Sequence, residues 1–233
     1  MKRILIVEDE TAIREFESIN LQRAGYETVE ADCGETALQI FNSDVLGFDI
    51  ALLDIMMPGI DGITVCKEIR KTNKSIGIIM LTAKSQEMDK IRGLMTGADD
   101  YITKPFSPAE LLARVDSLYR RVTMHSEKPQ SDNNRIIRGE FVLDLRRRTL
   151  TKSGRQIELT QVEFQIIEYF FNHPDTPLMR EEILQQVWGT NYFGEEKIVD
   201  VNIRRLRMKI EDDPSIPKHL ATVWGMGYKW NTD

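Results

Sequence analysis

Five side chains that could handle a phosphoryl group each stand at the end of a short apolar run. If these runs are parallel strands, their carboxyl ends meet at one edge of a sheet, and the side chains converge there. The side chains are Glu8, Asp9, Asp54, Thr82 and Lys104, and the runs are residues 4–7, 50–53, 78–81 and 101–103.

The chemistry of this group follows from its charges. Asp9 and Asp54, once close together, would repel each other strongly unless a cation neutralised them. Hard oxygen ligands favour Mg²⁺ or Mn²⁺. With such an ion bound, Asp54 can attack phosphorus and carry an acyl phosphate, while Lys104 supplies a fixed charge and Thr82 a hydroxyl hydrogen bond. Each acid alone would be a helix cap or a solvated strand end, but the five together favour a phosphoryl site.

The elements that position these residues alternate regularly. Apolar runs predict strands and amphipathic stretches predict helices, with glycines at the joints. Five such units predict an α/β fold with a five-stranded, doubly wound parallel sheet. Strands are predicted at 3–7, 26–31, 49–54, 76–81 and 100–103, and helices at about 11–24, 34–43, 62–72, 85–97 and 107–121.

The second half of the chain has a different pattern. Residues 136–159 alternate like short antiparallel strands, and Thr160 and Glu163 have capping-box spacing. The pattern predicts a smaller α+β domain of the winged helix-turn-helix type. Its helices are expected at about 160–172, 180–188 and 197–211 and its closing hairpin at 220–230; the domains are 1–122 and 135–233, with a flexible linker at 123–134.

Composition limits the class of protein. The chain is 41% hydrophobic and 29% charged, as is typical of a soluble globular protein. No stretch approaches the roughly 20 apolar residues of a membrane span, and no signal-peptide pattern opens the chain. Cys33 and Cys66 form neither a disulfide framework nor a metal-binding spacing. We therefore expect a cytoplasmic protein without a membrane partner.

The helix at 197–211 can be divided into faces by angle. Its apolar stripe, which includes Val199 and Ile203, should face the core. An exposed basic helix with a central valine suits the DNA major groove, although a solvated basic helix explains the pattern equally well. The opposite face is expected to hold Lys197, Val201, Arg204, Arg205 and Met208, and Arg207 and Lys209 are expected to flank the apolar stripe.

Residues 1–122 resemble the receiver domain of two-component response regulators. The motifs that carry the resemblance are residues 7–10, 53–62 and 96–106. It implies that a sensor histidine kinase phosphorylates Asp54. It also implies that Mg²⁺ is held by Asp9, Asp54 and the Met56 carbonyl, with Glu8 acting through water.

The same resemblance assigns phosphate sensing to Thr82 and Lys104 and an aromatic switch to Tyr101. On its own, Tyr101 would be a strand-end aromatic with a wet hydroxyl. The resemblance also implies a homodimer on phosphorylation, formed through a face of paired charges that would otherwise be a solvated surface. These charges are Lys90, Asp99, Asp100, Glu110, Arg114 and Arg121.

Residues 136–230 resemble the winged-helix domain of the OmpR/PhoB subfamily. The matching residues are 159–160, 163–164, 187–189, 200–210 and 225–228. The resemblance implies a recognition helix at 197–211 and a wing at 221–228 that bind tandem half-sites of promoter DNA, with RNA polymerase as a further partner. The expected DNA contacts are Lys197, Val201, Asn202, Arg204, Arg205, Arg207 and Trp224.

Two positions depart from that subfamily. Histidine is frequent where Asn202 stands, and asparagine can still contact phosphate. Arginine is common where Trp224 stands, so we hypothesise that this wing packs or stacks more than it reads sequence.

The sequence thus predicts a DNA-binding response regulator that is switched at Asp54 and is not a turnover enzyme. One alternative is a constitutive DNA binder with a degenerate receiver, which the complete set of pocket residues disfavours. Another is an enzyme that uses the acidic pocket, but the sequence offers no glycine loop for a nucleotide and no nucleophile–histidine pair.

Overall fold

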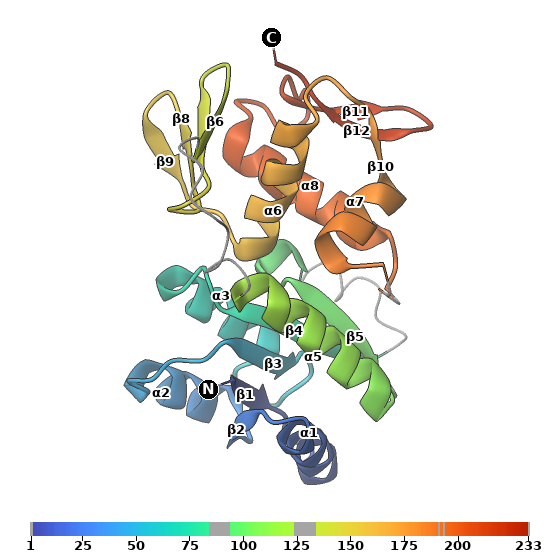
Figure 1. The fold of residues 1–233 in the computed structure, drawn as a ribbon. Coiled ribbons are helices and arrows are strands. Elements are labelled where there is room, and N and C mark those ends of the chain that lie inside the picture. Colours follow the sequence, from blue (N-terminus) through green and yellow to red (C-terminus); the bar gives the residue numbers. More distant parts are fainter. Residues whose placement is uncertain (1, 84–93, 124–133, 191, 193, 233) are drawn as a thin grey trace. The chain divides into compact units, whose positions relative to one another are not determined.

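The computed structural model describes residues 2–83, 94–123, 134–190, 192 and 194–232. The chain forms two compact units, which we call the N-terminal unit (residues 1–126) and the C-terminal unit (residues 127–233) (Figure 1). Residues 124–133 of the predicted linker at 123–134 lie outside the described residues.

The N-terminal unit is built on a five-stranded parallel sheet, as predicted. The strand order is β2-β1-β3-β4-β5, and every neighbouring pair is parallel. Continuous apolar runs suit such strands because helices cover both faces of the sheet. The strands are β1 (Arg3–Val7), β2 (Glu27–Ala31), β3 (Ile50–Asp54), β4 (Gly77–Ala83) and β5 (Asp100–Lys104).

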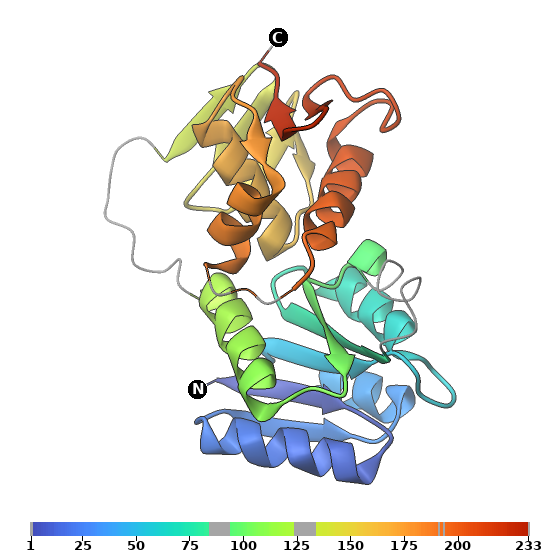
Figure 2. The same ribbon diagram turned by 90° about the vertical axis from the view of Figure 1, so that its right-hand side faces the viewer.

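Helices cover the two faces of this sheet (Figures 1 and 2). On one face, Leu21 of α1 and Val115 of α5 share a core cluster with strand residues such as Ile6 and Leu52. The helices are α1 (Thr11–Arg23), α2 (Gly34–Ser43), α3 (Gly62–Thr72) and α5 (Pro108–Thr123). Of the helix predicted at 85–97, residues 94–96 are helical, and residues 85–93 lie outside the described part of the chain.

The C-terminal unit has the elements that the sequence predicts, in the predicted order. A four-stranded antiparallel sheet comes first, followed by three helices and a hairpin. One further strand, β10, pairs with β12 and has too few residues to show a period. The elements are β6 (Arg135–Arg138), β7 (Phe141–Asp144), β8 (Thr149–Lys152), β9 (Arg155–Ile157), α6 (Gln161–Asn172), β10 (Leu178–Met179), α7 (Arg180–Trp188), α8 (Lys197–Ile210), β11 (Leu220–Val223) and β12 (Gly227–Trp230).

Local chemistry sets the start of α6. Glu163 N donates to Thr160 Oγ1, and Thr160 N donates to Glu163 Oε2, so the predicted capping box is confirmed. The helix then carries Phe171 into the core of the unit, where its ring lies 4.7 Å from that of Trp230. Trp230 in turn lies 5.1 Å from Phe141 of β7, which ties the hairpin to the first sheet.

In the part of the chain that the structure describes, no helix combines the length and the apolar character that crossing a membrane requires.

Candidate functional site

The carboxyl ends of β1 and β3 bring three carboxylates together. One oxygen each of Glu8, Asp9 and Asp54 lie within 4.8 Å of one another. Glu8 and Asp54 are buried, at 0% and 5% exposed, whereas Asp9 faces solvent. Negative charges this close repel strongly, and hard oxygen donors suit a divalent cation, so the group is a candidate metal site.

Lys104, at the end of β5, partly balances these charges. Its Nζ lies 2.7 Å from Glu8 Oε2 and 3.1 Å from Asp54 Oδ2. Burial lowers the pKa of Lys104, but the hydrogen bond to Glu8 and the charge of Asp54 outweigh burial and raise the pKa overall. Burial raises the pKa of Glu8, and Lys104 acts against that rise. The lysine therefore stays charged and in contact with the proposed phosphoacceptor.

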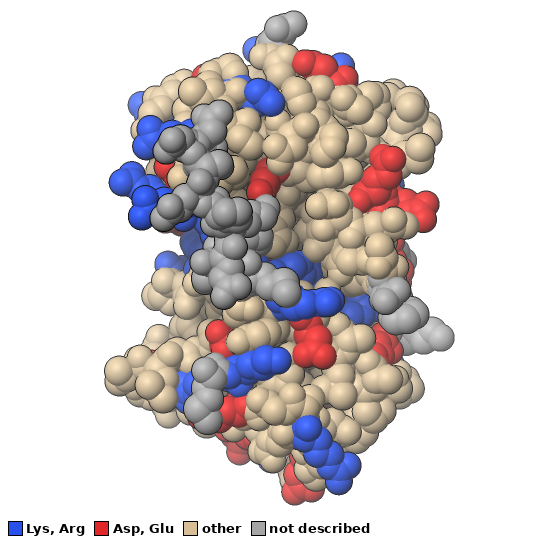
Figure 3. Space-filling view, in the orientation of Figure 1, with Lys and Arg blue, Asp and Glu red and all other residues tan. Residues whose placement is uncertain are grey.

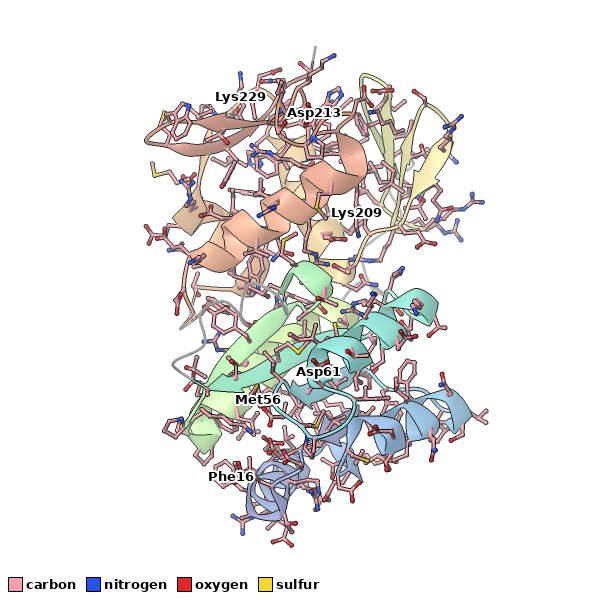
Figure 4. All side chains as sticks on the ribbon, turned by 180° about the vertical axis from the view of Figure 1, so that it is seen from behind. Phe16, Met56, Asp61, Lys209, Asp213 and Lys229 are labelled. Carbon is pink, nitrogen blue, oxygen red and sulfur yellow. The ribbon has the colours of Figure 1, made fainter. Side chains whose placement is uncertain are left out.

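The start of α3 packs closely against the backbone of Asp54. A Cβ on Gly62 would lie 2.0 Å from the Asp54 carbonyl oxygen, so the close approach of α3 to the strand requires glycine. Asp61 caps α3 by accepting a hydrogen bond of 2.7 Å from Thr64 N. Met56, the predicted carbonyl ligand, lies in this loop two residues after Asp54 (Figure 4).

The two predicted switch residues lie on neighbouring strands. Thr82 of β4 is buried, and its hydroxyl donates a long hydrogen bond of 3.4 Å to Ala83 O. A stronger acceptor placed nearby could replace that bond. Tyr101 of β5 is 5% exposed and stands opposite Met80, two residues before Thr82.

A fourth carboxylate, Glu17 of α1, lies within electrostatic reach of Glu8 and was not among the predicted site residues. Its side chain is 0% exposed, and neither carboxylate oxygen has a hydrogen-bond partner in the described structure. Burial, followed by the charge of Glu8, raises the pKa of Glu17 to about 8. Glu17 stands one helical turn before the core residue Leu21, and this spacing is the signal that could have revealed its burial.

Most of the predicted dimer-face residues form ion pairs within the chain. Arg114 Nη1 lies 3.2 Å and Arg121 Nη2 lies 3.9 Å from Asp100, and Arg114 also pairs with Glu110 at 3.6 Å. In the described structure these charged side chains therefore pair within one chain, and their pairing across two copies stays a prediction. Lys90 lies outside the described residues.

Asp99, another predicted dimer-face residue, is also paired within the chain, so its place in a dimer face stays a prediction. Asp99 is 0% exposed and its Oδ2 accepts hydrogen bonds from Arg70 Nη2 at 2.7 Å and from Ile78 N at 2.9 Å. The carboxylate thus joins α3 to β4, because a buried charge needs an opposite charge and hydrogen bonds at close range.

Helix α8 buries more of its surface than predicted. The stripe with Val199 and Ile203 is buried as expected, and Arg204 and Met208 are exposed. Asn202 is 0% exposed, however: its amide donates to Ile198 O, and its Oδ1 accepts from Arg205. The prediction that Asn202 contacts DNA is therefore wrong, since the helix itself satisfies this side chain.

Arg205 and Val201 were also expected on the open face, and both are buried. Arg205 Nη2 lies 2.8 Å from Glu163 Oε1, and Lys209 Nζ lies 2.6 Å from Glu163 Oε2 (Figure 4 labels Lys209). Burial opposes ionisation of Glu163, but the charges of Arg205 and Lys209 outweigh it and lower the pKa of Glu163. Arg205 therefore balances a buried carboxylate in place of reading DNA, and Val201 keeps an apolar side chain from water.

Arg207, another predicted DNA contact, holds the hairpin. Its Nε donates to Leu220 O and its Nη2 to Thr222 Oγ1, both at 2.8 Å. Three predicted contacts remain exposed: Lys197 at the start of α8, Arg204 in its middle, and Trp224 at the hairpin tip, which is 91% exposed. The hypothesis that this wing packs or stacks more than it reads sequence stays a prediction, and its indole is left uncovered by the described part of the chain.

A further group of basic side chains, which the sequence analysis did not single out, lies on the four-stranded sheet. Arg146, Arg147 and Arg155 are exposed, and Figure 3 shows basic side chains gathered on this side of the C-terminal unit. The run of arginines at 146–148 is a readable signal. Positive charge of this kind favours an anionic partner.

Comparison with known proteins agrees with both units. The model of the response regulator receiver domain matches residues 4–116, and that of the C-terminal domain of transcriptional regulatory proteins matches residues 154–230. DrrB of Thermotoga maritima, an OmpR/PhoB homolog, is 32% identical, with 99% of each chain covered and a TM-score of 0.50. A cysteine-to-serine mutant of RitR is 26% identical, with 99% of each chain covered and a TM-score of 0.77.

The chain is therefore a two-component response regulator, with a receiver domain followed by a DNA-binding, transcription-regulating domain. Within that class it belongs to the OmpR/PhoB family.

Replacing Glu17 with glutamine should change how stability depends on pH. The unfolded chain ionises this carboxyl above about pH 4.5, whereas the folded chain keeps the proton until about pH 8. The wild type therefore loses stability as pH rises through this window, on the order of 3 kcal/mol by pH 8, and the variant does not. Urea unfolding at pH 5 and pH 8 measures the difference.

The matched control for this prediction is Glu15→Gln, at an exposed position of the same helix. A stability difference between Glu17→Gln and the wild type that stays constant from pH 5 to pH 8 would contradict the prediction.

Proposed function

We propose that a sensor histidine kinase phosphorylates this protein on Asp54 in the presence of Mg²⁺, and that the phosphorylated receiver dimerises and places two C-terminal units on promoter DNA. The observation that carries the proposal is the convergence of Glu8, Asp9 and Asp54 within 4.8 Å, with Lys104 in contact with two of them. A winged-helix unit in the same chain supplies the output.

The phosphoryl transfer follows from this arrangement. An Asp54 oxygen attacks the phosphorus of a phosphohistidine, the phosphorus–nitrogen bond breaks, and the imidazole of the kinase leaves and takes up a proton. Asp9, Asp54, the Met56 carbonyl and Glu8 are the groups that would hold Mg²⁺, and the ion would supply positive charge to the transferred group. The chain promotes its own phosphorylation and dephosphorylation, and we propose no turnover of another substrate.

Residues of the receiver can then respond to the phosphoryl group by changing their contacts. Lys104 can exchange its contact with Glu8 for a phosphoryl oxygen, and Thr82 can exchange its long bond to Ala83 O for a charge-assisted one. Tyr101, which stands opposite Met80 two residues before Thr82, is the side chain that we propose follows that change. Such a change shifts an equilibrium between receiver forms toward the dimer. We propose that the dimer forms when Asp100, Arg114, Arg121 and Glu110 exchange their ion pairs within one chain for pairs between two copies.

On the DNA side, the corrected geometry supports fewer contacts than the sequence suggests. Lys197 and Arg204 are the exposed basic residues of α8, whereas Arg205, Arg207 and Lys209 lie against other parts of the C-terminal unit. The proposal therefore assigns contacts with phosphates or base edges to the two exposed residues. RNA polymerase as a further partner stays a prediction.

Asp9→Asn should weaken Mg²⁺ binding by about tenfold or more, because even indirect supports of a metal ligand are worth that much. Isothermal titration calorimetry with MgCl₂ measures the affinity. Asp61→Asn is the matched control, since asparagine caps a helix as well as aspartate does and Asp61 lies outside the carboxylate group. Equal Mg²⁺ affinity in Asp9→Asn and the wild type would count against the metal site.

Asp54→Asn should abolish acyl-phosphate formation with Mg²⁺ and a small phosphodonor, because an amide oxygen is too weak a nucleophile. Phosphate-affinity electrophoresis followed by hydroxylamine treatment, which cleaves acyl phosphates, measures the modification. Full phosphate incorporation into the variant would refute the site assignment.

Arg204→Ala and Arg205→Ala should separate DNA contact from structural support. Arg204→Ala should weaken DNA binding and reduce the slope of log K against log salt by about one, with unfolding unchanged. Arg205→Ala should cost about 3 kcal/mol of stability because it leaves Glu163 with one fewer counter-charge. DNA titrations at several salt concentrations and urea unfolding measure the two effects, and a normal stability of Arg205→Ala would overturn the assignment of its role.

A further inference from the structure

The tip of the hairpin β11–β12 presents an indole to solvent. Trp224 is 91% exposed and Met226 is 51% exposed, whereas the other two tryptophans, Trp188 and Trp230, are 2% and 0% exposed. An indole is among the largest apolar surfaces a side chain offers. Covering this tip with another molecular surface is therefore favourable.

The tip is held in place by its own turn and by its base. Met226 N donates to Val223 O at 3.0 Å, and Gly225 has a φ of +76°, which favours glycine. A Cβ on Gly227 would lie 2.1 Å from Leu178 O, so the hairpin packs closely on β10. The indole is therefore carried on a preorganised arm, and ordering it on binding costs little.

The base of the same hairpin is joined to helix α8. Arg207 of α8 binds Leu220 O and Thr222 Oγ1 of β11, and Tyr228 Oη donates to Asp200 Oδ1 of α8 at 2.6 Å. These hydrogen bonds fix the β11–β12 hairpin to α8. A DNA duplex bound along the exposed side of α8 would therefore lie within reach of the hairpin.

The chemistry of the tip limits what it can do to such a duplex. Residues 221–228 contain no lysine or arginine, so they cannot bind phosphate as cations or place a guanidinium in a narrow minor groove. What they offer is an aromatic plane and a thioether. Apolar side chains of this kind act on DNA by stacking or by partial insertion at a base step, which is easiest at flexible pyrimidine–purine steps.

We propose that Trp224 is an apolar wedge that stacks against a base step in the groove beside the segment contacted by α8, and that it selects sites by the deformability of that step. This inference rests on the proposed DNA-binding function and adds a specificity-determining residue to it.

The expected effects distinguish a wedge from a charged contact. Trp224→Ala should weaken binding to a selected duplex by about tenfold, since removing one stacking partner has effects of this size. The slope of log K against log salt should stay unchanged, because an indole releases no counterion. Trp224→Arg should steepen that slope by about one and reduce the preference for the flexible step.

The test uses full-length phosphorylated protein and a duplex selected from a random pool by the wild type. Trp224 is the exposed indole, so acrylamide quenching of tryptophan fluorescence reports on it, with Trp224→Phe as the reference for the two buried tryptophans. We expect the duplex to protect the indole from acrylamide. We also expect energy transfer between the labelled duplex ends to show a larger bend with the wild type than with Trp224→Ala.

Each alternative outcome has a distinct meaning. A duplex that binds while Trp224 stays fully accessible to acrylamide overturns the wedge and leaves the proposed function intact. Loss of affinity in Trp224→Ala with a smaller salt slope also overturns it, because the contact would then be ionic. Failure of the wild type to select any duplex overturns the DNA-binding proposal and the wedge with it. Trp224 lies on the surface, so unchanged thermal unfolding of the variants confirms that these comparisons report binding.

Discussion

The repulsion among three carboxylates at the carboxyl edge of the parallel sheet is the constraint on which the receiver depends. Glu8 and Asp54 are buried and Asp9 lies beside them, so the folded chain concentrates negative charge where water can least screen it. Lys104 offsets part of that charge by contacting two of the three carboxylates. A bound divalent cation would relieve the repulsion that remains, and Lys104 links the charge at this edge to the end of β5.

A second buried carboxylate has the corresponding role in the C-terminal unit. Glu163 caps α6 with one interaction and receives Arg205 and Lys209 of α8 with others. One side chain thus fixes where α6 begins and how α8 is rotated against it. The basic character of α8 consequently serves the fold first, and a smaller part of it remains for a nucleic acid.

The sequence predicted most of the fold, because its signals are local. Apolar runs, glycine joints and the Thr160 capping box each lie within a few residues, so the strands, the helices and the edge that carries Asp54 could be assigned from the sequence. The three carboxylates and Lys104 meet as expected because parallel strands leave little freedom in where their ends lie.

The errors came from partners that are distant in sequence. Periodicity located the apolar stripe of α8, but it could not show that Glu163, on another helix, would take Arg205 from the open face. Asp99 was assigned to the dimer face by resemblance, and the sequence could not show that Arg70 of α3, far from it in the chain, would pair with it. Glu17 carried a readable signal in its spacing from Leu21, but a charged residue on a core stripe is rare enough to be passed over.

The contacts of Glu163 with Arg205 and Lys209, which we call the Glu163 clamp, limit how α8 could be altered if the proposed DNA-binding role is to be directed at a new promoter. Random variation along the whole of α8 would often destabilise the C-terminal unit, since Arg205, Arg207 and Lys209 make structural contacts. A useful library would vary Lys197, Arg204 and Met208 together with the hairpin tip, and would leave the clamp untouched. The structural contacts of α8 therefore leave a small set of positions at which a proposed DNA preference could be changed without loss of the fold.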